Sequence, residues 1–490
     1  MLHAALKKAG FLPGGGSRRT MSQMRVLLVG AGGREHALGE ALHRSEAQLY
    51  VAAPTVNPGL KRRATEYFNV SVEDGASITA RARQVGAQLA VLGPDAAVAS
   101  GVGDALRAAG IPTVGPGREA AQIESSKAFA REFLARNGIQ ETPRFGIVRS
   151  AGDVDAAMAD FGNTPLVVKP SGLTGGKGVL VAGVDFASAE EGRKLAKDLL
   201  QSTGQPVVLE ERLEGEEFSL MAFVDGARVY PMPLVKDYKR ALDGDLGGNT
   251  GGMGSFSTRD HLLPYVTASD RDQAVSVMER TVSAMRKEGL DYRGVLYGGF
   301  MATAHGPVLL EYNARFGDPE ALNVLTVYDG TDFAPLLLSL AEGHLRTTFL
   351  QFRRRATVVK YLAPPGYGAS PSPGGTLTVD EATLARNAIT LYYGSVTPGP
   401  KPGTVVMGTS RAIALVGEAS SLREALGRVE EGLASVRGDY AMRRDIATAI
   451  DLKKRTTHME SLRGGTRAKA PPGAVENHTR SGPQPPQVFG

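Results

Sequence analysis

The strongest chemical signal in the sequence is a run of glycines, Gly175 to Gly178, around Lys177. Such a loop lets several backbone amides approach one anion, and the lysine adds positive charge. No serine or threonine follows Lys177, so the loop lacks the metal-holding residue of a Walker motif. Lys169 ends the preceding apolar run and needs an anionic partner, because an unpaired buried charge is costly. The segment predicts a mobile loop that closes over a triphosphate; the alternative is a flexible surface loop.

An acidic stretch, residues 207–219, follows this loop and begins as an apolar strand. Backbone groups at the end of such a strand can read the edge of an adenine. A carboxylate such as Glu217 can then accept hydrogen bonds from ribose hydroxyls. An acidic run alone is usually a solvated turn, so the prediction of a nucleotide hinge depends on the loop before it.

Glu311, Asn313 and Arg315 alternate at the end of another apolar run. Alternate residues of a strand point to the same face of a sheet. A carboxylate and an amide oxygen on one face suit Mg²⁺, which prefers oxygen ligands shared with nucleotide phosphates. Arg315 can neutralise charge on a phosphoryl group in transfer. These residues predict a metal-dependent phosphoryl-transfer site; the alternative is a polar sheet face exposed to solvent.

A second glycine-rich turn, residues 30–37, joins an apolar strand to a helical pattern. Backbone amides and the helix dipole bind anions at such turns. Glu35 stands where a dinucleotide-binding turn needs a small residue, and it would obstruct close packing of helix and strand. Arg34 offers a forked donor for a phosphate, and Asp95 follows a later strand at the rim where open α/β sheets bind ligands. We expect a phosphate-bearing substrate rather than a dinucleotide, with an exposed helix start as the alternative.

Residues 247–254 form a third glycine-rich segment, with five glycines in eight positions. Each glycine costs about 0.5–1 kcal/mol inside a regular element, so this density indicates backbone that approaches a ligand. Asp237 and Lys239 lie shortly before it and can recognise an ammonium and a carboxylate, as in a zwitterionic amino acid.

The elements that must position these motifs alternate between strand and helix from residue 24 to 125, which predicts a doubly wound parallel sheet. The next region predicts a helix at 127–137, strands at 166–169 and 178–184, and a long helix at 270–288. A strand-rich part follows. The fold class is therefore α/β: an N-terminal doubly wound domain, a two-part nucleotide domain with a mobile lid, and a small β-rich C-terminal domain. The expected bounds are 24–125, 126–350 with the lid at about 140–208, and 351–460.

Composition excludes several other classes of protein. The 490 residues are enough for three or four modules, and the absence of cysteine excludes disulfides and cysteine nucleophiles. Much of the net charge of +5 lies in the two ends of the chain, so we expect no nucleic-acid partner. No run of about 20 apolar residues is present, so we expect no membrane partner and a cytoplasmic protein. Residues 1–23 are expected to be a dispensable or artefactual extension, and residues 461–490 a disordered tail.

Taken in order, the loop, the acidic hinge and the Glu-x-Asn-x-Arg strand resemble the ATP-grasp superfamily. Within it, Gly-Gly-Arg-Glu-His-Ala at 32–37, Asn-Thr-Gly-Gly-Met-Gly at 249–254 and Arg-Phe-Gly-Asp-Pro-Glu at 315–320 resemble the phosphoribosylamine–glycine ligases, in an archaeal-type branch. The resemblance covers about residues 24–455. It implies an ATP-dependent ligase of purine biosynthesis that joins glycine to 5-phosphoribosylamine through a glycyl phosphate.

The resemblance also implies roles for individual residues. ATP is the substrate and Mg²⁺ or Mn²⁺ the cofactor, in a monomer or weak homodimer. Nucleotide contacts are expected at Lys127, Lys169, Gly175, Gly176, Lys177, Gly178, Glu210, Leu213 and Glu217. Substrate contacts are expected at Gly32, Gly33, Arg34, Asp95, Asn249, Thr250, Gly251, Gly252, Met253 and Gly254. The metal ligands would be Glu311 and Asn313, and the catalytic residues Arg315, Asp237 and Lys239.

Two departures from the commonest bacterial pattern, Tyr238 for His and Asp95 for Glu, put nearby substrate contacts in doubt. The nearest alternative function is a carboxylating or formate-using ATP-grasp enzyme, against which the 249–254 segment weighs. A non-catalytic nucleotide-binding protein would not need Glu311, Asn313 and Arg315 together. A dehydrogenase is the weakest alternative.

Overall fold

The computed structural model describes residues 23–175, 178–345 and 350–467. Its N-terminal sheet is parallel, in the order β3-β2-β1-β4-β5. Adjacent residues of β1 pack into two different cores, so both faces of the sheet are covered, as a doubly wound fold requires. The strands are β1 (Arg25–Val29), β2 (Gln48–Ala53), β3 (Glu66–Asn69), β4 (Leu89–Leu92) and β5 (Thr113–Val114). The helices are α2 (Gly33–Arg44), α3 (Pro58–Arg63), α4 (Gly75–Gln84), α5 (Asp95–Ala99), α6 (Val102–Ala108) and α7 (Arg118–Ser125).

The region expected to form the lid, which keeps that name below, is an antiparallel sheet with its own apolar core, in the order β6-β9-β7-β8. The strand expected at 178–184 is shorter than predicted, because Gly183 has a φ of +78° and the chain turns there to bond Phe186. The strands are β6 (Phe145–Val148), β7 (Leu166–Pro170), β8 (Leu180–Val181) and β9 (Val207–Glu211). The helices are α8 (Lys127–Arg136), α9 (Ala151–Phe161) and α10 (Ala189–Thr203).

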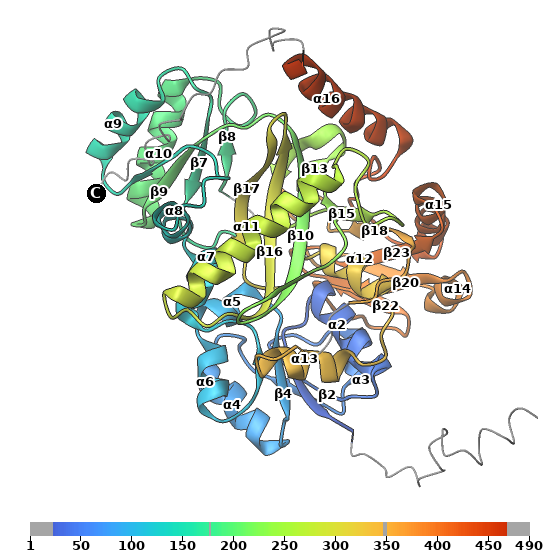
Figure 1. Ribbon diagram of the computed structural model, residues 1–490. Helices are drawn as coiled ribbons and strands as arrows, with labels where there is room; N and C mark the ends of the chain where they lie inside the picture. Colours follow the sequence, from blue (N-terminus) through green and yellow to red (C-terminus); the bar gives the residue numbers. More distant parts are fainter. Residues whose placement is uncertain (1–22, 176–177, 346–349, 468–490) are drawn as a thin grey trace, which may run out of the picture.

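A second antiparallel sheet, in the order β11-β10-β16-β17, forms the centre of the molecule (Figure 1). Helix α11 (Ala268–Lys287) packs on it and begins at a capping box in which Thr267 and Asp270 bond each other's backbone N–H. The strands are β10 (Glu216–Asp225), β11 (Val229–Pro231), β16 (Arg293–Thr303) and β17 (Gly306–Asn313). Figure 1 shows the lid sheet beside this central sheet and the N-terminal sheet below it.

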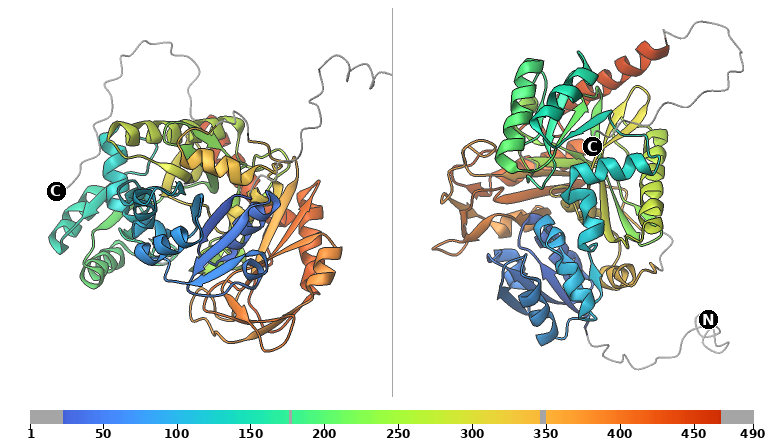
Figure 2. Two further views of the ribbon diagram at one scale, coloured as in Figure 1. Left: turned by 90° about the horizontal axis from the view of Figure 1, so that it is seen from below. Right: turned by 90° about the vertical axis from the view of Figure 1, so that its left-hand side faces the viewer.

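The C-terminal sheet combines strands from both sides of residue 350, in the order β12-β15-β18-β23-β20. Figure 2 shows it next to the N-terminal sheet, with α2 contacting β20. Its strands are β12 (Lys236–Asp237), β15 (Gly254–Ser257), β18 (Ala356–Leu362), β20 (Ile389–Tyr393) and β23 (Ile413–Ala419). Smaller strands are β13 (Arg240–Leu242), β14 (Leu246–Asn249), β19 (Thr376–Val379), β21 (Val396–Pro398), β22 (Thr404–Met407) and β24 (Val436–Arg437). The helices are α12 (Glu320–Val327), α13 (Phe333–Ala341), α14 (Glu381–Arg386), α15 (Leu422–Leu433) and α16 (Ala449–Arg467).

Helix α16 corrects the prediction of a tail from residue 461, because it continues to Arg467. Ion pairs dock it: the Arg455 guanidinium contacts carboxylate oxygens of the buried Glu216 at 2.7 Å and of the partly exposed Asp245 at 3.0 Å. The hydroxyl of Tyr238 donates to Asp451 of the same helix. Tyr238 therefore points away from the neighbouring site residues, and the departure at this position does not bear directly on substrate contact. None of the described helices is both long and apolar enough to cross a membrane.

Candidate active site

Lys169 of β7 and Glu210 of β9 form the buried inner face of the lid. The Lys169 ammonium donates to Glu210 Oε2 at 2.6 Å, and Arg131 Nε of α8 donates to Glu210 Oε1 at 2.6 Å. Burial opposes ionisation of this carboxyl, but the two cations hold the pKa of Glu210 at about 2. Arg131 also donates to the carbonyls of Leu309 and Leu310, at 3.3 and 2.7 Å, and so joins α8 to β17. Glu210, predicted as a nucleotide contact, is thus occupied in orienting two cations, and Arg131 is a residue that the sequence analysis missed.

Lys127 stands at the start of α8, where Ser126 caps the helix. Its ammonium donates to the carbonyl of Gly172 at 3.1 Å, in the chain that leads into the glycine loop. Burial lowers the pKa of Lys127, and the charge of Glu311 partly opposes this. The lysine therefore lies within electrostatic range of Glu311, one of the two expected metal ligands. Of the other nucleotide residues, Gly175 and Gly178 have φ of +59° and +97°, Leu213 is half-buried, and Gly176 and Lys177 lie outside the described residues.

Glu311 and Asn313 occupy the end of β17, opposite Gly299 and Tyr297 of β16. Burial raises the pKa of Glu311, but Lys239 and Lys169 outweigh it and hold the pKa below its ordinary value, so the side chain is ionised near neutral pH. An ionised carboxylate beside an amide oxygen fits Mg²⁺ or Mn²⁺. Among the described residues, no group of three or more His, Cys, Asp or Glu side chains could hold a metal. The two residues thus suit an ion whose remaining ligands come from nucleotide phosphates and water.

Arg315 follows β17 and contacts both Asn313, an expected metal ligand, and Glu124 of the N-terminal region. Its Nη2 donates to Asn313 Oδ1 at 3.1 Å and lies 3.1 Å from Glu124 Oε1 of α7. Glu124 Oε2 accepts the backbone N–H of Ala314 at 2.7 Å, so it orients the arginine through two bonds. Within the described part of the chain, the buried Nε of Arg315 has no hydrogen-bond partner. That donor is available for an incoming oxygen; Glu124 is a second residue that sequence analysis missed.

Asp237 of β12 is buried beside the 249–254 segment. Its Oδ1 has no hydrogen-bond partner among the described residues, and a side chain at Gly252 would place its Cβ 2.4 Å from that oxygen. Burial, followed by the charge of Glu320, raises the pKa of Asp237 well above its ordinary value. Glu320 accepts hydrogen bonds from the hydroxyls of Tyr297 at 2.7 Å and Ser219 at 3.1 Å. A buried, unpaired carboxyl oxygen of this kind can receive a substrate N–H.

Lys239 lies in the same site but contacts acidic residues. Its ammonium is 3.1 Å from Glu217 Oε2 and 3.7 Å from Glu311 Oε1. Although burial opposes its charge, these two carboxylates raise the pKa of Lys239 well above its ordinary value. In turn Lys239 is the main cause that lowers the pKa of Glu217 to about 2. The lysine expected at a substrate carboxylate is thus paired with the expected ribose and metal residues.

The 249–254 segment is held in place by Arg411, from the loop before β23. Its Nη1 donates to the carbonyls of Gly251, Gly252 and Asp318, at 2.5, 3.0 and 2.7 Å, and its guanidinium stacks 4.7 Å over the Tyr361 ring. At the other end of the segment, Asn249 Nδ2 donates to the carbonyl of Val179 at 3.3 Å, which links the segment to the lid. Thr250 Oγ1 accepts the Gly252 N–H at 3.0 Å. Met253 and Gly254 are both buried, and Gly254 is the first residue of β15. Arg411 is a third residue that the sequence did not indicate.

In the glycine turn after β1, the groups predicted to bind phosphate donate to acceptors within the protein. The Gly32 N–H, expected to bind phosphate, donates to Glu35 Oε2 at 2.6 Å. Arg34 is buried rather than exposed, with Nε bonded to Glu35 at 2.6 Å and Nη1 to the carbonyl of Phe316 at 3.1 Å. Glu35 fills the space beside Gly93, the residue directly after β4. Asp95 is the first residue of α5, its carboxylate accepts the Ala96 N–H at 2.9 Å, and its charge reaches Glu124 and Arg315.

His36 of this turn has a structural role, and its burial makes the stability of the fold depend on pH. Its Nδ1 accepts the backbone N–H of Tyr393 at 2.8 Å, its ring stacks on Tyr393, and burial lowers its pKa to about 4. Below pH 6.5 the unfolded chain binds a proton that the folded chain excludes. We therefore expect the free energy of unfolding to fall by about 3 kcal/mol between pH 6.5 and 4 from this group. Urea titrations of wild type and His36→Gln test this: the variant should show a smaller fall, and an equal fall would contradict it.

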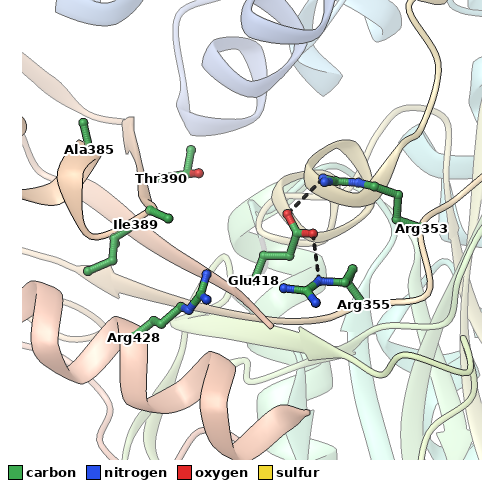
Figure 3. Close-up of a pocket in the computed structure, with 8 residues that line it drawn as sticks. Arg353, Arg355, Ala385, Ile389, Thr390, Glu418 and Arg428 are labelled. Atoms are coloured by element: carbon green, nitrogen blue, oxygen red, sulfur yellow. Dashed lines mark hydrogen bonds and ion pairs between the residues drawn. The ribbon is translucent and has the colours of Figure 1, made fainter. Parts of the chain in front are cut away.

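A hollow of about 510 Å³ lies apart from these residues, in the C-terminal part of the chain (Figure 3). Glu418 accepts hydrogen bonds from Arg353 at 2.9 Å and Arg355 at 3.3 Å across it. None of the residues predicted for the active site lines this hollow, which is formed by Arg353, Arg355, Ala385, Ala388, Ile389, Thr390, Glu418 and Arg428.

The lid and central sheets, with cationic residues on one and a Glu-Asn pair on the other, define an ATP-grasp protein. Residues 125–321 match the family model described as phosphoribosylglycinamide synthetase, ATP-grasp (A) domain, and residues 24–124 match the N domain of the same enzyme. The chain belongs to the phosphoribosylamine–glycine ligase family. This confirms the fold class, the family and the ligase class predicted from the sequence.

Individual relatives agree with this assignment. The chain is 45% identical over 439 residues to a phosphoribosylamine–glycine ligase of Pyrococcus horikoshii, covering 90% of this chain and 98% of the relative. It is 44% identical over 444 residues to one of Methanocella arvoryzae, covering 90% and 100%. The crystal structure of a phosphoribosylamine–glycine ligase from Thermotoga maritima superposes with a TM-score of 0.71 at 30% identity, covering 86% of this chain and all of that one.

Proposed function

We propose that this chain uses ATP to join glycine to 5-phosphoribosylamine, and that it gives glycinamide ribonucleotide, ADP and phosphate in purine biosynthesis. The observation that carries the proposal is the meeting of Glu311, Asn313 and Arg315 with Asp237 and the 249–254 segment in one site. The family membership supports it, because relatives that match over 90% of the chain carry this ligase name.

In the first step, a glycine carboxylate oxygen attacks the γ-phosphorus of ATP and the bond to the bridging oxygen breaks, which releases ADP. Glu311 and Asn313 would hold Mg²⁺ or Mn²⁺, which supplies charge neutralisation on the phosphates. Lys169 and Lys127 would bind the nucleotide phosphates from the lid side. Arg315 directs its unpaired Nε at the phosphoryl oxygens, and Asp237 binds the glycine ammonium through its unpaired oxygen.

In the second step, the amine nitrogen of phosphoribosylamine attacks the carbonyl carbon of glycyl phosphate. The bond between the carbonyl carbon and the oxygen that bridges to phosphorus then breaks. Phosphate leaves and takes up the proton that the amine loses. The chain contributes position and charge rather than a covalent nucleophile. The glycine-rich 249–254 segment, whose carbonyls Arg411 holds, would form the wall against which the acyl phosphate lies. The expected cytoplasmic location and the monomeric or weakly dimeric state remain predictions.

An ADP-release assay tests the proposed reaction. Glycine and phosphoribosylamine are offered to the purified protein separately and then together, with Mg²⁺ and ATP. We expect sustained ADP release only when both are present. ADP release that instead depends on bicarbonate or formate would assign the chain to another ATP-grasp reaction.

A further inference from the structure

Lys239 holds a position in which an ammonium joins two acidic groups of the proposed nucleotide site. Its Nζ lies 3.1 Å from Glu217 Oε2 of β10 and 3.7 Å from Glu311 Oε1 of β17. The three side chains are 32%, 38% and 34% exposed, so the ion pairs lie at the open side of the site rather than in the core. The lysine thus bridges the strand expected to read the ribose and the strand expected to hold the metal.

The backbone at Lys239 is held by hydrogen bonds, while its side chain is long and has several rotatable bonds. The carbonyl of Lys239 accepts both the N–H of Thr250 at 2.7 Å and its hydroxyl at 2.8 Å. These bonds tie the residue to the 249–254 segment. A lysine stem has four flexible methylene groups, so the ammonium can be relocated without a change in this backbone.

An ammonium and a divalent cation cannot share one carboxylate without strong repulsion. Glu311 is the one carboxylate of the proposed metal pair, and Lys239 contacts it directly. The other charged groups that act on Lys239 are Asp237 and Glu217, while Lys127 and Lys169 also act on Glu311. The bound ammonium is therefore positioned as a competitor of the metal.

We propose that Lys239 is a tethered cation that occupies the site between Glu217 and Glu311 until a divalent metal displaces it. Displacement would free the ammonium for the anionic reactants on the neighbouring 249–254 segment. The inference rests on the proposed function, because it takes Glu311 as a metal ligand. Removal of this lysine therefore strengthens metal binding to the nucleotide-free protein.

Mn²⁺ binding to the nucleotide-free protein, measured by electron paramagnetic resonance, tests the inference. Lys239→Met should bind Mn²⁺ about tenfold more tightly than wild type, since a competing unit charge in contact with the ligand is lost. Lys239→Arg keeps the charge and should bind about as weakly as wild type. Lys127→Met removes an equal charge, but its ammonium bonds the Gly172 carbonyl instead of Glu311, so its effect should be clearly smaller.

Two outcomes are distinguishable from each other. Affinity in Lys239→Met that equals or falls below wild type, while Glu311→Gln abolishes binding, would overturn the competitor role and leave the metal site standing. Binding in Glu311→Gln as tight as in wild type would overturn the metal assignment, and the inference with it. If Lys239→Met fails to fold, as circular dichroism would show, Lys239→Gln offers the same loss of charge with a shorter polar side chain.

Discussion

Glu311→Gln is expected to lower kcat by about a thousandfold at saturating ATP, because charge neutralisation of a transferring phosphoryl group is worth about 10³ or more in rate. The substitution keeps the shape of the side chain and removes its charge. It also removes the direct ion pair with Lys239. The loss should be accompanied by a higher Mg²⁺ concentration for half-maximal turnover, which steady-state assays across a metal titration would measure.

The matched control is Glu279→Gln, an exposed glutamate of α11 that lies outside the site. It should retain wild-type turnover and the wild-type metal dependence. Undiminished Mg²⁺-dependent turnover in Glu311→Gln would show that the metal is bound elsewhere. A similar loss in both variants would indicate a global effect of the substitutions rather than a role for the site.

Arg315→Met is expected to reduce kcat by about a thousandfold as well, for a different reason, since an arginine that meets phosphoryl charge contributes 10³–10⁵ in rate in comparable sites. It should also destabilise the fold by about 3 kcal/mol, because it leaves the buried Glu124 carboxylate without its cation. Burial already raises the pKa of Glu124, with Arg315 as the main opposing charge. Single-turnover ADP formation and chemical denaturation would measure the two effects separately.

A double variant separates the catalytic and the structural contributions of Arg315. Arg315→Met with Glu124→Gln removes both charges, while the glutamine oxygen can still accept the Ala314 N–H. Its stability should return most of the way to wild type, and its turnover should stay low. Recovery of turnover together with stability would mean that Arg315 acts only by holding the fold.

The two predictions also distinguish functions that share this fold. Loss of turnover in both variants, with ADP binding retained, is expected of a phosphoryl-transfer site. In a protein that only binds the nucleotide, substitution of Lys169 would weaken ADP binding. Substitution of Arg315 would leave ADP binding unchanged. Equilibrium ADP binding by calorimetry in the Arg315 variants therefore complements the kinetic assays.

The class of fold follows from local patterns in the sequence, and the predicted ligands of the proposed metal rest on the same kind of pattern. Apolar runs that end in glycine predict buried parallel strands, and β1 and β4 form at these runs. The two strands are parallel neighbours, so the glycines that follow them lie on the same side of the N-terminal sheet. The alternation of Glu311, Asn313 and Arg315 is likewise a local property, because side-chain direction along a strand has a period of two. Local patterns of this kind depend only on neighbouring residues, so they can be read without the rest of the molecule.

Tertiary structure alone decided which charges meet. Arg131 and Glu210 are 79 residues apart, and Glu124 and Ala314 are 190 apart, so no local pattern connects them. Their pairing follows from the packing of α7 and α8 against β9 and β17. This packing buries the charged groups, and a buried charge is costly unless it has a partner.

The same reason explains why several groups predicted to contact the substrate bond partners within the chain. Arg34 and the Gly32 amide were expected to face a phosphate, but Glu35 of the same turn is buried with them and satisfies both. Lys239 was expected at a substrate, but β10 and β17 bring two carboxylates within its reach. Residue types and spacing thus determined which chemistry the site can carry, while the fold decided which residues are free to perform it, because buried charges are satisfied by whatever partners packing brings near.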